Sequence, residues 1–249
     1  MNNNGKLYIG TSGWQYKHWA GTFYPETIKT KDHFAYYQSQ FNTVELNNSF
    51  YHLPDKTTFK KWHDITPPHF HFAVKASRYI THMKKLKDPD EALHRFFLNA
   101  EALEEKLSVI LFQLPPHWKL NYERLKEFLS RLPRGHRSTF EFRDVSWYQP
   151  EVFELLHKHH CSFCIYELDG HQSPEVITTN FLYIRLHGPG AKYQGLYTSE
   201  VLEQWAKKCV DWQQSGKDVF IYFDNDQDGY AAINARELQD IIQLMQLAA

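Results

Sequence analysis

The sequence has few cysteines, almost no net charge and no long apolar run. Its 249 residues include 3 cysteines, an odd number that does not suggest a disulfide framework. A formal net charge of −1 gives no overall field that would attract nucleic acid or an anionic membrane, although a local basic patch is compatible with it. No stretch reaches the roughly 20 apolar residues of a membrane span, and the first residues show no charged-then-apolar leader. We therefore expect a cytoplasmic protein that does not enter a membrane.

Several motifs that would identify a cofactor or a metal are also missing. No G-x-G-x-x-G follows the first apolar run, and there is no G-K-[ST] or H-E-x-x-H. His69 and His71 lie at the start of a predicted strand, away from the end where barrel sites form. Cys161 and Cys164 have the C-x-x-C spacing, but positions i and i+3 of a strand face opposite ways, so we interpret both as core residues. We expect no bound metal and no cofactor.

Eight short apolar runs are present, and each ends in polar residues, as is typical of strands buried on both faces. These predicted strands span 7–12, 43–48, 71–76, 108–114, 138–143, 162–167, 181–187 and 218–224. Helical patterns follow seven of them, at 31–41, 57–65, 88–106, 121–132, 150–160, 198–215 and 231–247. The segment 169–180 is too short for a full crossover helix, and we expect a reduced helix or a turn there.

This alternation predicts an α/β fold, a TIM (β/α)8 barrel with a reduced helix between strands six and seven. No Gly/Ser- or Pro-rich linker divides the chain, so residues 1–249 are expected to form a single domain. The alternative is a doubly wound open sheet, which the count of eight strands and the missing G-x-G-x-x-G disfavour.

Charged residues at the ends of the predicted strands indicate a site. Glu141 and Arg143 are two residues apart, so they share one face of their strand, opposite Phe140 and Phe142. A surrounded strand carries opposite charges inward only where something satisfies or uses them. The same alternation, applied to every strand, predicts one pocket at the C-terminal ends of the strands. Its expected polar residues are Ser12, Glu45, Asn47, Lys75, Gln113, Glu141, Arg143, Arg185, His187 and Asp224.

These residue types suit acid–base chemistry on an anion. The predicted catalytic residues are Glu141, Lys75, Glu45 and Asp224, because carboxylates beside a lysine can exchange protons. The predicted ligand-binding residues are Arg143, Arg185, His187, Asn47, Gln113, Ser12, Trp14, Tyr51 and Asn225. The alternative is a buried salt-bridge lattice, for example Glu45 with Lys75 and Glu141 with Arg185, that only fills the barrel. The spacing does not choose between them.

The loops after the strands are rich in aromatic and basic residues. Aromatic residues make up 16% of the chain, which also contains 15 histidines. Examples after the strands are Trp14, Tyr51-His52, Arg78-Tyr79, His82, Lys84, Lys85 and Trp147-Tyr148. Such a rim favours sugars, bases or phosphates, which stack on aromatic rings and pair with cations. The alternative is that the aromatic rings pack onto their own barrel.

Taken together, the strand ends resemble a known family. The segments YIGTSGW, FNTVELNNSFYHLP, FAVKASRYITH, LFQLPP, FEFRDVSW, YIRLHGP and YFDND are similar to those of the DUF72 family, the YecE-like proteins. The resemblance extends from Leu7 to about Leu247 and implies a TIM barrel. It implies no catalytic residues, because the family has no established activity. Its barrel is similar to those of endonuclease IV and xylose-isomerase-like enzymes, which has suggested a nucleic-acid role, but this sequence lacks their histidine-rich metal set.

Three functional hypotheses follow. The first is an enzyme that acts without a metal on a small anionic, sugar-like or phosphorylated molecule. The second is a protein that binds or processes nucleic acid through the aromatic and basic rim. The third is a non-catalytic protein that binds a ligand.

Overall fold

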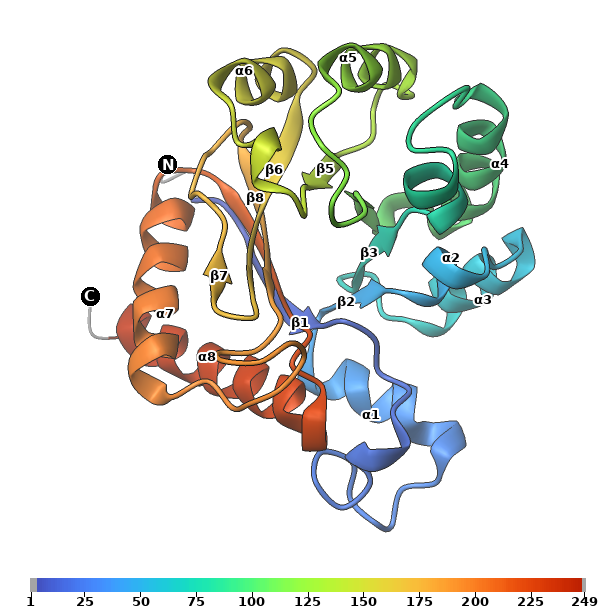
Figure 1. Cartoon of the computed structure of the whole chain (residues 1–249). Coiled ribbons are helices and arrows are strands. Elements are labelled where there is room, and N and C mark those ends of the chain that lie inside the picture. Colours follow the sequence, from blue (N-terminus) through green and yellow to red (C-terminus); the bar gives the residue numbers. More distant parts are fainter. Residues whose placement is uncertain (1–3, 248–249) are drawn as a thin grey trace. The chain divides into compact units, whose positions relative to one another are not determined.

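The computed structural model describes residues 4–247, in which strands and helices alternate along the chain (Figure 1). The chain forms two compact units. Unit 1 contains the chain through Val44, the segment Ile165–Ser173 and the residues from Asn180 onward. Unit 2 contains Glu45–Cys164 and Pro174–Thr179. Each unit has its own parallel strands, helices and core.

Unit 1 is built on three parallel strands in the order β1, β9, β8. They are β1 (Leu7–Thr11), β8 (Phe181–Leu186) and β9 (Asp218–Phe223), and Tyr222 of β9 lies level with Gly10 and Arg185 on its two neighbours. The helices of this unit are α1 (His33–Gln40), α7 (Ser199–Gln214) and α8 (Tyr230–Leu247), with short 3-10 turns at Lys17–Trp19, Thr30–Asp32 and Gln227–Gly229.

Unit 2 is built on parallel strands that neighbour one another in chain order. They are β3 (His71–Lys75), β4 (Leu107–Gln113), β5 (Ser138–Glu141) and the first half of β6 (Cys161–Leu168), together with the end of β2 (Thr43–Leu46). The helices are α2 (Asn48–Tyr51), α3 (Lys56–Ile65), α4 (Asp90–Ala100), α5 (Tyr122–Arg131) and α6 (Pro150–Lys158). Shorter turns are the π-helix Tyr79–Met83 and the 3-10 segments Glu101–Lys106 and Val145–Trp147.

All eight predicted strands form, because each apolar run is buried along most of its length. The predicted helices form as well, and local signals set their starts. Asp55 accepts a hydrogen bond from the Thr58 amide at 2.7 Å to begin α3, and Asn121 accepts one from the Arg124 amide at 3.1 Å to begin α5. The predicted helix 88–106 is divided, since α4 ends at Ala100 and a 3-10 segment continues to Lys106.

The segment 169–180 corrects one expectation, because it contains no reduced helix. It forms a hairpin in which β7 (His171–Gln172) pairs antiparallel with the end of β6. Asp169 and Gly170 make the two-residue turn with φ of +53° and +72°. An Asp-Gly pair favours this left-handed conformation and therefore a hairpin. Ser173 continues the pairing, since its hydroxyl accepts a hydrogen bond from the Tyr166 amide at 2.8 Å.

Aromatic rings make up much of the core of each unit. In unit 2, Phe142 stacks on Trp147 with ring centroids 4.8 Å apart, on the side of β5 that the alternation assigned to Phe140 and Phe142. In unit 1, Trp14 stacks on Phe34 at 4.3 Å. The three cysteines are buried and none forms a disulfide bond, and the burial agrees with the prediction for the C-x-x-C pair. Among residues 4–247, no helix combines the length and the apolar character that crossing a membrane requires.

Candidate functional site

The end of β5 carries a buried ion pair. Glu141 is fully buried, and its Oε1 contacts Nε of Arg143, whose side chain is 7% exposed. The Cys164 thiol lies 3.9 Å from the other carboxylate oxygen. The contact confirms that Glu141 and Arg143 share a face, and the pairing explains how a buried strand tolerates both charges.

Lys75 occupies the corresponding place at the end of β3. Its ammonium lies 4.4 Å from the centroid of the Phe50 ring, a cation–π contact. The Ser49 hydroxyl donates to the Lys75 carbonyl at 2.6 Å and so ties the short helix α2 to β3. This contact places the Phe50 ring beside the lysine, and Lys75 itself is half-buried.

The pKa of His82 depends on the charged side chains around these strand ends. Burial is the main cause that lowers its pKa to about 4, and the positive charges of Lys75, Arg78 and Arg143 lower it further. Glu141 acts in the opposite direction but does not compensate. Cations therefore dominate the field here, and the imidazole is neutral at pH 7.

The loops beside this cationic group expose large apolar side chains. Tyr51 on α2 is 73% exposed, and Tyr79 and Met83 on the π-helix are 45% and 66% exposed. The Lys84 ammonium lies 5.8 Å from the centroid of the Tyr79 ring. The predicted aromatic and basic rim is therefore present on unit 2 at α2 and the π-helix, whereas Trp147 is fully buried in the core.

Three further predicted residues lie at strand ends of unit 2. Gln113 pairs in register with Glu141 on the neighbouring strand, and its amide donates to the Leu114 carbonyl at 3.1 Å. Glu45 is fully buried on β2. Asn47 follows β2, and its buried Oδ1 has no hydrogen-bond partner among residues 4–247.

Unit 1 holds a second polar group at the ends of β1, β8 and β9. Nη2 of Arg185 lies 3.1 Å from Oδ2 of Asp224 and 3.3 Å from the Ser12 hydroxyl. Arg185, at 1% exposed, and His187 are buried, and the Asp224 side chain is 14% exposed. One guanidinium and one carboxylate balance in charge, and hydrogen bonds to both stabilise them in the low dielectric.

The hydrogen bonds of His187 determine where its proton lies. Nη1 of Arg185 is 3.2 Å from Nε2 of the imidazole, and Nδ1 is 2.9 Å from Oδ2 of Asp224. A guanidinium can only donate, so Nε2 accepts and Nδ1 carries the proton that it donates to Asp224. The arrangement orients a neutral imidazole between a cation and a carboxylate, as acid–base sites require.

Two other predicted binding residues of unit 1 are buried. The Asn225 amide nitrogen donates to the Gly195 carbonyl and to the Asn234 side chain, both at 2.9 Å, and so links the loop after β8 to α8. Its Oδ1 is buried without a partner in the described part of the chain. Trp14 is 5% exposed and packs on Phe34. The prediction that these residues and those of unit 2 line one pocket stays a prediction.

Asp226 is a titratable residue that the site prediction did not include. It accepts a hydrogen bond from the Trp19 indole at 2.6 Å and lies 3.3 Å from the His18 imidazole. Burial raises its pKa to about 6, against the lowering effects of Trp19 and His18, and the charge of Asp224 adds to the rise. The acidic run 224–228 is the signal in the sequence that could have identified it.

One group of side chains in the described residues has the spacing of metal ligands. His63, Glu104 and Glu105 offer ligand atoms within 4.8 Å of one another, between α3 and the segment that precedes β4. The Lys60 ammonium already pairs with Glu104 at 3.1 Å and with Asp64 at 3.0 Å. The geometry fits a surface ion-pair network, and none of these residues lies at the predicted site.

Comparisons with known proteins agree on the family. The family model described as "Protein of unknown function DUF72" matches residues 8–248. The UPF0759 protein YunF of Bacillus subtilis is 27% identical, over 96% of this chain and 95% of its own length. The UPF0759 protein YecE of Escherichia coli is also 27% identical, over 57% of this chain and 50% of its own length.

Solved structures agree as well. A DUF72 family protein of Thermotoga maritima is 31% identical, with a TM-score of 0.87 over 96% of this chain and 99% of that one. A DUF72 family protein of Enterococcus faecalis has a TM-score of 0.80 at 19% identity, over 95% of each chain. The predicted fold class is confirmed as a TIM-like α/β barrel of mostly parallel strands with helices between them. The chain belongs to the DUF72 family.

Proposed function

We propose that the protein is an enzyme that acts, without a metal, on a small anionic, sugar-like or phosphorylated molecule at the strand ends of unit 2. The observation that supports this proposal is the group of basic side chains at these strand ends, Lys75, Arg78 and Arg143, whose charges add to the effect of burial in lowering the pKa of His82. An anionic ligand could pair with such side chains.

The burial of each residue suggests its role. Lys75 is half-buried and Arg78 is exposed, so both can touch a ligand. Glu141 is fully buried against Arg143. A ligand anion would offer Arg143 another partner, and the released carboxylate could then give or take a proton. Phe50 and Tyr51 would provide aromatic surface for a sugar ring.

Equilibrium binding of a panel of sugar phosphates and sugar acids tests this proposal. We expect Lys75→Met to weaken binding of the best ligand at least tenfold, about 1.4 kcal/mol. Glu141→Gln should retain binding and lose turnover, because the amide keeps the shape of the side chain but cannot exchange a proton. Lys207→Met, on the exposed surface of α7, is the matched control and should behave as wild type.

Two outcomes would contradict the proposal. Failure of every anion in the panel to bind would remove the ligand class, and unchanged binding by Lys75→Met would remove the site. Binding without any turnover would instead favour a non-catalytic ligand-binding protein.

The exposed rim on unit 2 favours a second candidate, a protein that binds single-stranded nucleic acid. Tyr51 and Tyr79 are exposed, and the Lys84 ammonium lies 5.8 Å from the centroid of the Tyr79 ring. Bases stack on such rings while cations contact the phosphates. A fluorescent oligonucleotide should bind at low salt and be released as salt increases. The double variant Tyr51→Ala/Tyr79→Ala should reduce this affinity, and no binding by wild type at low salt would eliminate the candidate.

A further inference from the structure

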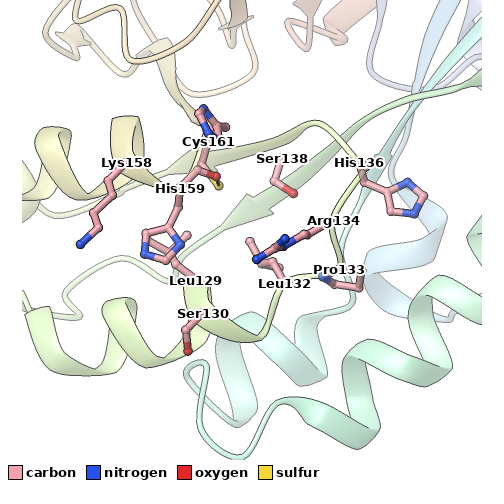
Figure 2. Close-up of a pocket in the computed structure, with 12 residues that line it drawn as sticks. Leu129, Ser130, Leu132, Pro133, Arg134, His136, Ser138, Lys158, His159 and Cys161 are labelled. Atoms are coloured by element: carbon pink, nitrogen blue, oxygen red, sulfur yellow. Dashed lines mark hydrogen bonds between the residues drawn. The ribbon is translucent and has the colours of Figure 1, made fainter.

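A cavity of about 610 Å³ lies in unit 2 where β5 and β6 begin, at the opposite end of β5 from Glu141 (Figure 2). Its walls include Leu129 and Ser130 at the end of α5, Ser138 at the start of β5 and Cys161 at the start of β6. The volume is within the range of sites that hold small molecules, roughly 300–1,000 Å³.

The walls of this cavity carry positive charge and no carboxylate. Arg134, Lys158 and the histidines 136, 159 and 160 line it, and no Asp or Glu does. Arg134 and Lys158 are exposed and form no ion pair within residues 4–247. Among these lining residues, only His136 has an acidic partner in the described part of the chain, Glu101 at 2.9 Å. In Figure 2 the Arg134 side chain extends into the space between His136 and His159.

A buried hydroxyl also lines the cavity. Ser138 is 3% exposed, and its side chain makes no hydrogen bond to any described residue. In Figure 2 its oxygen points to the side of the cavity where Arg134 lies. The hydroxyl is therefore available to donate a hydrogen bond to a ligand in the cavity.

Helix capping explains only part of the charge. The C-terminal ends of α5 and α6 carry partial negative charge, which favours basic residues in their last turns, such as Arg131 and Lys158. His159 also donates to the Leu129 carbonyl at the end of α5. Capping does not explain Arg134, which lies beyond the end of α5, or a hollow that no carboxylate enters.

We propose that this cavity binds a small phosphate-bearing anion. The Arg134 guanidinium would bind the phosphate through bidentate hydrogen bonds. Lys158 would add a second positive charge, and the Ser138 hydroxyl would donate a hydrogen bond. The site is separate from the one in the proposed function, because the two lie at opposite ends of the strands of unit 2. The chain would therefore bind anions at two places, and this one is far from the acid–base residues.

Calorimetric titration of the whole chain with inorganic pyrophosphate, at constant ionic strength, tests the inference. Wild type should bind, and the double variant Arg134→Gln/Lys158→Gln should bind at least tenfold more weakly. The control Lys61→Gln/Lys207→Gln removes the same charge from exposed positions on α3 and α7 and should leave the affinity unchanged. Circular dichroism would verify that each variant is folded.

Two further variants locate the site within the unit. Ser130→Glu introduces a carboxylate at the exposed rim of the cavity and should also weaken binding tenfold or more. In Lys75→Met, the binding that Arg134→Gln/Lys158→Gln weakens should remain, because Lys75 lies at the end of β3 rather than at this cavity. The inference is overturned if wild type does not bind pyrophosphate or if both double variants bind equally well. Loss of binding in Lys75→Met alone would assign the anion to the other end of the strands.

Discussion

The polar groups of the two units differ in how their charges are balanced. In unit 1, Arg185, His187 and Asp224 bond to one another, with Asp224 the most exposed at 14% of its side chain. In unit 2, three cations act on His82 against one carboxylate, Glu141, and aromatic side chains nearby are exposed. A balanced network stabilises the fold and holds a geometry, whereas an unbalanced group is suited to bind a ligand of opposite charge.

The largest effect should come from removing the guanidinium of unit 1. Arg185→Met removes the buried guanidinium that contacts Asp224, His187 and Ser12, so we expect a loss of about 3–5 kcal/mol in the free energy of unfolding. Urea denaturation measures it. Arg78→Met, an exposed arginine of unit 2, is the control and should change stability by less than about 0.5 kcal/mol. If Arg185→Met and Arg78→Met lower the free energy of unfolding by the same amount, the polar groups of units 1 and 2 do not differ in their contribution to stability.

A smaller loss of stability is expected in unit 2 when the pH is lowered, because His82 takes up a proton. The pKa of His82 is lowered to about 4, below its ordinary value of 6.5, so the unfolded chain binds the proton more readily. Stability from this residue is therefore complete above about pH 6.5 and is lost as pH falls toward 4. After allowance for solvent screening, we expect a loss of about 1 kcal/mol between pH 7 and pH 5.

His82→Gln should remove this part of the pH dependence, because glutamine does not titrate. Denaturation curves of wild type and variant at pH 7 and pH 5 measure the difference. The same pH dependence in both proteins would mean that the cations around His82 do not act on it.

The smallest effect is expected in unit 1, where Asp226 should make the folded chain less stable as pH rises, the opposite of the effect of His82. The pKa of Asp226 is raised to about 6, so the folded chain holds this proton more tightly than the unfolded chain does. The contribution of Asp226 to the free energy of unfolding is largest below about pH 4 and is lost as pH rises through 6. Asp226→Asn still accepts from the Trp19 indole, and it should reduce the loss between pH 5 and pH 7 by about 0.5 kcal/mol. If the free energy of unfolding changes between pH 5 and pH 7 by the same amount in Asp226→Asn and in wild type, the raised pKa of Asp226 is contradicted.

Much of the fold followed from local patterns in the sequence. Strands such as β4 read as continuous apolar runs because both of their faces are buried, and helices such as α5 begin at a capping residue. The hairpin at Asp169-Gly170 was missed because we used the length of the segment to predict its structure and did not apply the preference of the dipeptide. The 3-10 segment after Ala100 was missed because its composition continues the helical pattern of α4.

The alternation along a strand predicted which side chains share a face, but not which charges pair. Alternation along β5 placed Glu141 and Arg143 on one face, and their contact confirms it. Within its own unit Arg185 contacts Asp224, a pairing that the alternation did not suggest, and the suggested pair of Glu141 with Arg185 stays a prediction. Which charges meet depends on register and on loop geometry, which no spacing along one strand contains.

The sequence by itself determined the alternation of strands and helices, the polar residues at the strand ends and the family, because each depends on patterns within short segments. Only the tertiary structure decided that Arg185, His187 and Asp224 contact one another, that the charges of Lys75, Arg78 and Arg143 act on His82, and that Arg134, Lys158 and Ser138 line a cavity. These residues are far apart in the chain or lie in different elements. Their distances, and therefore their electrostatic interactions, are defined only when the elements have packed.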